Sequence, residues 1–255
     1  VSHRAHASNV GIASDLETVA GFLMEKEINY IGKTLEAPAH PFVAIIGGAK
    51  VSDKIGVISN MIEKVDTIII GGGMAHTFDA ARGLPIGDSL CEPDKMDLAK
   101  ELLAKARGVK VILPLDVAVA NMFPLADEAK FKAEGKTKVV DVDKVEDGWQ
   151  ALDSGPKTSA AYVEALNGAK TIIWNGPMGV FECDEFAKGT LAVAKAVADA
   201  TEAGATSIVG GGDSIAALKK TGLTDKISHV STGGGATLEF LEGKEMPGIA
   251  AIADK

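Results

Sequence analysis

Residues 42–54 read Phe-Val-Ala-Ile-Ile-Gly-Gly-Ala-Lys-Val-Ser-Asp-Lys, a short apolar run that ends in two glycines and continues into an amphipathic segment. Further short runs rich in β-branched residues occupy residues 67–70, 109–113, 171–174, 207–209 and 227–230. Amphipathic stretches with helical spacing alternate with them, at residues 51–64, 97–107, 158–166 and 186–202. This alternation predicts an α/β fold, a three-layer, doubly wound (Rossmann-like) sheet of mainly parallel strands with helices on both faces.

The segment before this pattern has the features of one long helix. Residues 14–17, Ser-Asp-Leu-Glu, match a capping box, in which the serine hydroxyl and the glutamate carboxylate satisfy free amides at a helix start. Apolar residues keep helical spacing from there until Pro38 and Pro41 interrupt it. We therefore expect a helix that begins at Ser14 and ends before Pro38.

Charge and composition exclude several classes of protein. The 255 residues carry 26 Lys and Arg against 35 Asp and Glu, and no basic block could follow a nucleic-acid backbone. No apolar run approaches the about 20 residues that a membrane span needs. We expect a soluble, cytoplasmic protein without nucleic-acid or membrane partners, with Cys91 and Cys183 as free thiols. The chain begins at Val1, and we expect a fragment or a processed chain.

Glycine clusters follow five of the predicted strands. They are residues 47–48, 71–73, 176–179, 210–212 and 233–235. A glycine in such a loop can simply supply the positive φ of a tight turn. Five loops at the carboxyl edge of a parallel sheet can instead present backbone amides and helix N-termini to phosphate groups, and we favour this polyphosphate site. The P-loop pattern G-x-x-x-x-G-K-[ST] does not occur. The dinucleotide pattern G-x-G-x-x-G fails as well, because His76, Ile215 and Leu238 stand where its third glycine would be.

Charged residues near these loops each allow two interpretations. Lys50 and Lys54 share one side of a helix if it begins near Lys50, either as solvated lysines or as partners of a bound anion. Asp213 is either a helix cap or a ligand of Mg²⁺ beside phosphate oxygens. Glu182 is either a surface acid or an acceptor for ribose hydroxyls.

A small basic cluster lies near the amino end. His3, Arg4 and His6 make a poor metal site, because no third ligand is evident. An anion site suits them better, since arginine binds phosphate or carboxylate bidentately.

Taken together, these motifs resemble those of the phosphoglycerate kinase family over essentially the whole chain. The matching residues are 3–8 (His-Arg-Ala-His-Ala-Ser), 47–51 (Gly-Gly-Ala-Lys-Val), 70–75 (Ile-Gly-Gly-Gly-Met-Ala), 174–177 (Trp-Asn-Gly-Pro), 179–182 (Gly-Val-Phe-Glu), 210–213 (Gly-Gly-Gly-Asp) and 228–236 (Ser-His-Val-Ser-Thr-Gly-Gly-Gly-Ala). Their order and the absence of long insertions make the resemblance specific. Ser214 stands where many members have threonine, which keeps the hydroxyl.

The resemblance implies a glycolytic phosphotransferase. The family transfers the acyl phosphate of 1,3-bisphosphoglycerate to Mg-ADP, reversibly, giving 3-phosphoglycerate and ATP between two lobes that close on each other. It implies a full-length monomer that uses Mg²⁺ with ATP or ADP. This chain resembles the nucleotide-binding lobe, so we expect it to bind Mg-nucleotide and to be inactive alone.

The resemblance also implies a division of the chain. Residues 1–13 would be a remnant of the amino-terminal substrate domain, and residues 14–37 an interdomain helix, which the family places from about Phe22 to Leu35. Residues 38–243 would form the nucleotide-binding domain, and residues 244–255 a return segment toward the amino-terminal domain.

Individual roles follow from the same resemblance. The implied catalytic residues are Lys50, Gly211 and Gly234. The implied nucleotide-binding residues are Gly48, Ala49, Lys54, Gly71, Ala151, Leu152, Asn175, Pro177, Val180, Glu182, Gly211, Gly212, Asp213 and Ser214. Asp213 would hold Mg²⁺, and Arg4 with His6 would contact phosphoglycerate.

Two rival functions remain open from the sequence. A non-catalytic nucleotide-binding module would need the same glycine loops. A nicotinamide-dependent dehydrogenase is disfavoured by the failed third glycine and by Lys50 and Lys54 at the first turn.

Overall fold

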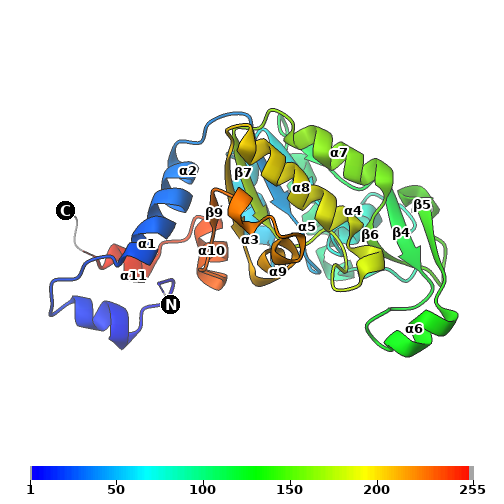
Figure 1. Cartoon of the computed structure of the whole chain (residues 1–255), viewed down its shortest axis with the longest axis horizontal. Helices are drawn as coiled ribbons and strands as arrows, with labels where there is room; N and C mark the ends of the chain where they lie inside the picture. The colour runs from blue at the N-terminus through cyan, green and yellow to red at the C-terminus, as the bar shows by residue number, and fades with distance from the viewer. Residues whose placement is uncertain (1, 253–255) are drawn as a thin grey trace.

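Residues 2–252, which the computed structural model describes, form two sheets (Figure 1). The larger sheet has the strand order β3-β2-β1-β7-β8-β9, and every neighbouring pair is parallel. Its strands are β1 (Phe42–Ile46), β2 (Thr67–Ile70), β3 (Lys110–Ile112), β7 (Thr171–Asn175), β8 (Thr206–Gly210) and β9 (His229–Val230). The predicted α/β class and the six predicted strands are confirmed.

Helices cover both faces of this sheet, as a doubly wound fold requires. On one face, Ala44 and Ile46 of β1 pack in a core with α3 (Ile55–Ile62), α4 (Ala75–Ala81) and α5 (Met96–Lys105). On the other face, Val43 and Ile45 pack with α7 (Pro156–Leu166), α8 (Lys188–Glu202) and α9 (Gly212–Thr221). Strand β1 is buried on both faces. Burial of each of its large apolar side chains therefore contributes about 1.5–3 kcal/mol to the free energy of folding.

A second, antiparallel sheet was not predicted from the sequence. It has the order β5-β4-β6, formed by β4 (Asp116–Ala120), β5 (Thr137–Asp141) and β6 (Gln150–Ser154), with α6 (Glu128–Glu134) beside it. Figure 1 shows it at the end of the molecule away from the two termini. Its small core centres on Val117, Val119 and Ala151. Its strands carry few of the bulky β-branched and aromatic residues that mark a strand in the sequence, which is why they were not predicted.

A buried carboxylate fixes the second sheet to the first. Asp116 at the start of β4 accepts hydrogen bonds from the backbone amides of Thr158, at 2.8 Å, and Lys157, at 3.1 Å. Thr158 Oγ1 in turn donates to the carbonyl of Asp116, at 2.6 Å. Asp116 therefore satisfies free amides in the first turn of α7 and ties β4 to a helix of the large sheet.

The expected helix start at Ser14 is wrong. Helical structure resumes at Phe22, with α1 (Phe22–Glu27), a wide π-helical turn η2 (Ile28–Gly32) and α2 (Lys33–Glu36) in succession. The Ser14 hydroxyl donates to the carbonyl of Gly11 at 2.7 Å, so it closes the turns that follow η1 (Ala7–Gly11) and opens no new helix. Leu16 and Val19 are largely exposed, so the apolar spacing there has nothing to pack against.

Glu27 joins this helical segment to the end of β9. Its carboxylate accepts hydrogen bonds from the Ser231 hydroxyl at 2.8 Å and the Thr232 amide at 2.7 Å, and lies 3.0 Å from Nε2 of buried His229. Burial acts to raise the pKa of Glu27, but these three partners outweigh it and hold that pKa below its ordinary value. The His229 ring also stacks on Tyr30, so the helix is held against the loop that follows β9.

The remaining elements are short. They are η3 (Pro93–Lys95), η4 (Val142–Lys144), η5 (Asp184–Phe186), η6 (Thr224–Lys226), α10 (Gly235–Leu241) and α11 (Pro247–Ala250). The segments near the two ends lie together, since the Gly248 amide donates to the Ser2 carbonyl at 2.8 Å. Cys91 and Cys183 are free, as expected. Within residues 2–252, no helix combines the length and apolarity needed to cross a membrane. The last three residues of the expected return segment lie outside the described residues.

Candidate functional site

Three glycine loops interlock where β1, β2 and β7 end. The Gly48 amide after β1 donates to the Pro177 carbonyl after β7, at 3.0 Å, and the Gly72 amide after β2 donates to the Met178 carbonyl, at 3.2 Å. Strands β1 and β7 are neighbours although far apart in the chain, so the strand order reverses between them. Such a reversal is where ligands bind in open parallel sheets.

Some of these glycines are required by packing alone. Gly176 has a φ of +98°, and a Cβ at this position would overlap the carbonyl of Gly47. Gly212 differs, because its φ is not left-handed and a Cβ there would meet no atom within 4 Å among the described residues. The turn interpretation therefore explains Gly176, while Gly212 leaves open space in front of the first amides of α9.

Lys54 lies at the start of α3 and points toward these loops. The helix begins at Ile55, later than expected, so Lys50 is exposed before it and does not share a helical face with Lys54. The Lys54 ammonium donates to the side-chain oxygen of Asn175. Burial lowers the pKa of Lys54, and the carboxylates of Asp53, Asp213 and Glu242 only partly oppose this. A partly desolvated cation next to open space is suited to binding an anion.

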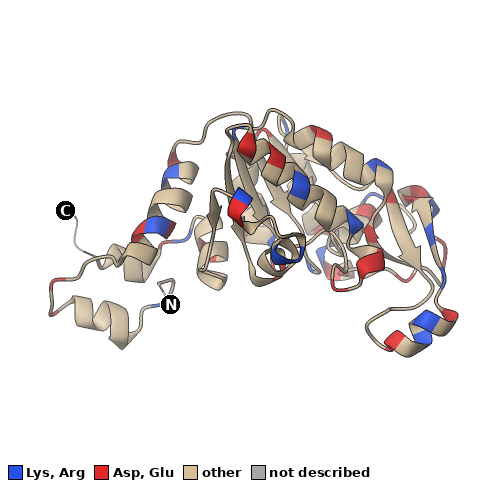
Figure 2. Cartoon of the chain, in the orientation of Figure 1, with Lys and Arg blue, Asp and Glu red and all other residues tan. Residues whose placement is uncertain are grey.

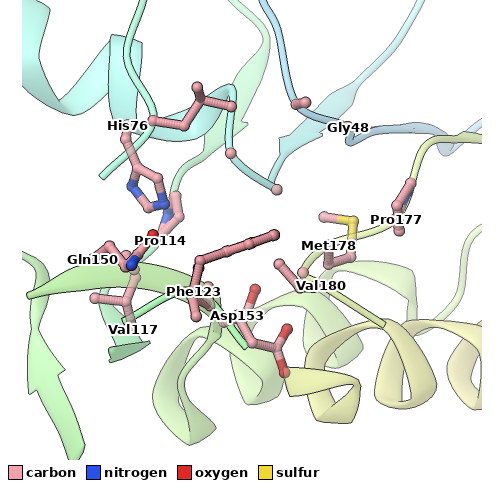
Figure 3. A pocket seen from close by; sticks show the side chains of 18 of the residues that line it. Gly48, His76, Pro114, Val117, Phe123, Gln150, Asp153, Pro177, Met178 and Val180 are labelled. Atoms are coloured by element: carbon pink, nitrogen blue, oxygen red, sulfur yellow. The ribbon is translucent and has the colours of Figure 1, made fainter. Parts of the chain in front are cut away.

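A cavity of about 460 Å³ lies between the glycine loops and the second sheet (Figure 3). Its volume is in the range of small-molecule sites. Leu90, Phe123 and Leu125 are among the large apolar side chains that remain exposed in the described chain, and all three line this cavity. Exposed apolar side chains that surround a hollow indicate a ligand with an apolar body.

The two ends of the cavity differ in chemistry. Gly48 and Pro177 lie at one end, near the interlocked loops, as Figure 3 shows. His76, Pro114 and Gln150 lie at the opposite end. One end thus offers backbone amides close to a lysine, and the other offers apolar walls with a few polar side chains.

Many of the predicted nucleotide-binding residues meet in this cavity. Those that line it are Gly48, Ala49, Ala151, Leu152, Pro177, Val180, Glu182 and Asp213. Gly71 lies behind its wall, where a Cβ would overlap the Met178 side chain. Ser214 is buried and its hydroxyl accepts a 2.6 Å hydrogen bond from the Gly176 amide, so this hydroxyl holds the loop and does not face the cavity.

Other predicted residues lie outside the cavity. Arg4 and His6 are exposed in the amino-terminal segment, which Figure 1 places at the opposite end of the molecule from the second sheet. Gly211 and Gly234 are the residues before α9 and α10, with φ values of +91° and +52°. Lys50, Arg4 and His6 are therefore not brought to the cavity, and their predicted roles stay predictions.

Sequence reasoning missed several lining residues, of which Asp153 on β6 is the most buried carboxylate. Its Oδ2 accepts a 2.9 Å hydrogen bond from the Gly189 amide at the start of α8. Its Oδ1 is buried without a hydrogen-bond partner among the described residues. Burial raises the pKa of Asp153 to about 7, although amides of Gly189, Ser154 and Lys188 act in the opposite direction. Val117 and Val119 alternate with smaller or polar residues in residues 116–120, which could have indicated β4, but residues 150–154 show no period-2 alternation that could have indicated β6.

Asp153 is expected to make stability depend on pH. The folded carboxyl titrates near 7 and the unfolded one near its ordinary value, so the folded state binds the extra proton between these values. Stability should therefore fall as pH rises toward 7. We expect the free energy of unfolding of the parent, relative to Asp153→Asn, to decrease by about 2 kcal/mol between pH 5.5 and 8. Urea unfolding of both proteins at each pH measures this, and a constant difference would contradict it.

The chain matches the family model described as "Phosphoglycerate kinase" over residues 1–244. The chain belongs to the phosphoglycerate kinase family. It is 55% identical over 255 residues to a phosphoglycerate kinase of Chloroflexus aurantiacus, covering 99% of this chain, and 58% identical to that of Levilactobacillus brevis, covering 100% of it. The predicted family membership is confirmed.

Solved phosphoglycerate kinases share the fold. The structure from Coxiella burnetii superposes with a TM-score of 0.91 at 46% identity over 98% of this chain, and that from Pyrococcus horikoshii with 0.80 at 34% over 98%. This chain spans only part of these phosphoglycerate kinases: 62% of the Chloroflexus aurantiacus and Coxiella burnetii proteins, and 61% of the other two.

Proposed function

We propose that the chain forms the nucleotide-binding half of a phosphoglycerate kinase, which transfers a phosphoryl group reversibly between 1,3-bisphosphoglycerate and Mg-ADP. The cavity carries this proposal, because it joins an apolar end to an end lined by glycine loops and Asp213, with Lys54 beside those loops. An adenosine group fits the first end and a chain of phosphates fits the second.

The phosphate end combines fixed dipoles with a cation. Helix α9 has ten residues, and its first amides, from Gly212 on, have no carbonyl partner within the helix. Lys54 lies close enough to Asp213 for the two charges to interact. Phosphoryl transfer depends on positioning and on neutralising the charge of the phosphates, so these groups supply what the reaction needs without a general base.

Magnesium is the metal that this end would hold together with the nucleotide. Residues 2–252 contain no cluster of three or more His, Cys, Asp or Glu side chains placed to bind a metal ion. Asp213 is exposed on the cavity wall in the first turn of α9. This fits Mg²⁺, which is usually bound by one or two carboxylates plus substrate phosphates and waters, and which neutralises phosphate charge when bound.

We assign the substrate side of the reaction to residues outside the cavity. Lys50 is exposed next to the glycine loop after β1 and is free to follow the transferred phosphoryl group. Gly211 and Gly234 precede α9 and α10 and would present backbone to that group. Arg4 and His6 would contact phosphoglycerate, as basic groups bind anions.

An apolar surface supports the proposed role of the helical segment between two domains. Figure 2 shows η1 without Lys, Arg, Asp or Glu residues. Beyond it, Ile12, Leu16, Val19, Phe22 and Leu23 are exposed, with Phe22 at 92%. Several large exposed apolar side chains in one segment indicate an interaction site. We propose that this surface packs on the part of the relatives' length that the chain does not span, with residues 38–243 as the nucleotide-binding domain.

A coupled assay tests the proposal. We expect the pure 255-residue chain to bind Mg-ADP but to form no measurable ATP from 1,3-bisphosphoglycerate, because half of the substrate contacts are missing and water is not excluded. Adding the amino-terminal part of a close relative should restore turnover, and the same mixture with Lys50→Met should not. Turnover by the chain alone would contradict this division of roles, and binding without any restored turnover would favour a non-catalytic nucleotide-binding module.

A further inference from the structure

One histidine stands at the apolar end of the cavity. His76 comes from the first turn of α4, lines the cavity, and has a side chain that is only 8% exposed. Figure 3 shows its ring projecting from α4 toward the side where Pro114 and Gln150 lie, away from Gly48 and Pro177. A polar ring in this position faces whatever part of the ligand lies farthest from the phosphates.

A buried carboxylate lies beside one nitrogen of this ring. Asp79, one turn further along α4, is fully buried, and its Oδ2 lies 3.5 Å from Nδ1 of His76. That oxygen has no hydrogen-bond partner among the described residues, while its other oxygen lies 3.3 Å from the Arg82 guanidinium. The tautomer with its proton on Nδ1 directs an N–H toward this oxygen and leaves Nε2 as a hydrogen-bond acceptor.

The surroundings of His76 add further acceptors. The Asp88 amide donates to the Trp149 carbonyl at 2.9 Å, which places Asp88 beside Gln150, and both side chains line the cavity. No lysine or arginine lines this cavity among the residues that the structure describes. Because the Asp88 carboxylate and the Gln150 amide oxygen accept hydrogen bonds, a ligand group that donates them matches this end.

We propose that His76 determines base specificity by accepting a hydrogen bond at Nε2 from an exocyclic amino group of the nucleobase, with Asp79 as its positioning residue. The proposal rests on the proposed nucleotide site. A 6-aminopurine offers an N–H donor at this place, whereas a 6-oxopurine offers a carbonyl oxygen that repels Nε2. The site should therefore prefer adenine nucleotides over hypoxanthine nucleotides that are otherwise the same.

Calorimetric titration with Mg-ADP and Mg-IDP tests this, because the two ligands differ only at and around position 6 of the base. We expect the parent chain to bind Mg-ADP about tenfold more tightly than Mg-IDP. This is the expected effect of losing the hydrogen bond to Nε2 and placing a second acceptor against it. In His76→Phe, which keeps an aromatic ring but removes Nε2, the two affinities should agree within about twofold. Retained binding of Mg-IDP shows that this variant is folded.

A second variant tests the role of Asp79. It also keeps the proposal testable if His76→Phe fails to fold. Asp79→Asn keeps the shape of the side chain but no longer favours a proton on Nδ1, so the preference for Mg-ADP should narrow about threefold. A parent that binds both ligands equally, or variants that both keep the full preference, would overturn the inference and leave the nucleotide site standing. A parent that binds neither ligand would overturn the nucleotide site and the inference with it.

Discussion

Replacing Lys54 by methionine is expected to weaken the binding of Mg-ADP about 100-fold, because it removes the half-buried cation that lies beside the glycine loops at the proposed phosphate end of the cavity. The same change should leave the unliganded chain as stable as the parent or more so. Burial lowers the pKa of Lys54, which means that folding disfavours its charge at neutral pH, and methionine carries no charge to bury.

Titration calorimetry and thermal unfolding of the same preparation separate these two effects. The matched control is Lys105→Met, because Lys105 is an exposed lysine at the end of α5, away from the cavity. It should change neither the affinity for Mg-ADP nor the melting temperature appreciably. Equal affinities of the parent and Lys54→Met would contradict the assignment of Lys54 to the phosphates.

Replacing Gly176 by alanine is expected to lower the free energy of unfolding by about 4 kcal/mol or more. Two costs combine at this residue. Its φ of +98° is disfavoured for any residue with a Cβ, and that Cβ would overlap the Gly47 carbonyl at the junction of β1 and β7. Relief would require the two central strands to separate, which would also open the interlocked loops beneath the cavity.

Gly168→Ala is the control for the first of these costs. Gly168 has a φ of +78°, and a Cβ there would meet no described atom within 4 Å. We expect it to lose only about 1 kcal/mol, the cost of the backbone conformation. Urea unfolding of both variants gives the comparison. Similar losses in the two would mean that the close approach of the loops does not contribute to stability.

The parallel sheet could be predicted from sequence because its strands are buried on both faces. Runs such as residues 42–46 and 67–70 are almost entirely apolar and end in glycine, so both their type and their carboxyl ends are recognisable. The glycine loops also indicated one end of the cavity, because the carboxyl ends of parallel strands meet at one edge of a sheet, while the binding of phosphates there stays a prediction.

The apolar end of the cavity could not be predicted in the same way. It is built largely by the antiparallel sheet, whose strands pack against two small cores and carry alanine and charged residues in place of long apolar runs. His76 lies on a short helix, and nothing in its local sequence shows that its ring lies beside Pro114 and Gln150 in a cavity. Contacts between distant segments determine which residues line this end of the cavity, and these contacts cannot be predicted from local residue spacing.

The helix start was mispredicted for a related reason. A capping box describes what Ser14 and Glu17 can do for a helix, but the helix also needs something to pack against. Leu16 and Val19 have no such partner in the described chain, and the Ser14 hydroxyl instead donates to the preceding turn. At Phe22 the segment reaches the contacts made by Glu27 and Tyr30, and helical structure begins there.

The central claim is that the carboxyl edge of the large sheet and the antiparallel sheet form one nucleotide site, and amide hydrogen exchange with and without saturating Mg-ADP tests it most directly. We predict slower exchange in residues 47–54, 71–76, 150–154, 176–182 and 211–215, with little change in η1 and α11. Protection confined to other segments, or no change at concentrations that saturate phosphoglycerate kinases, would contradict the account.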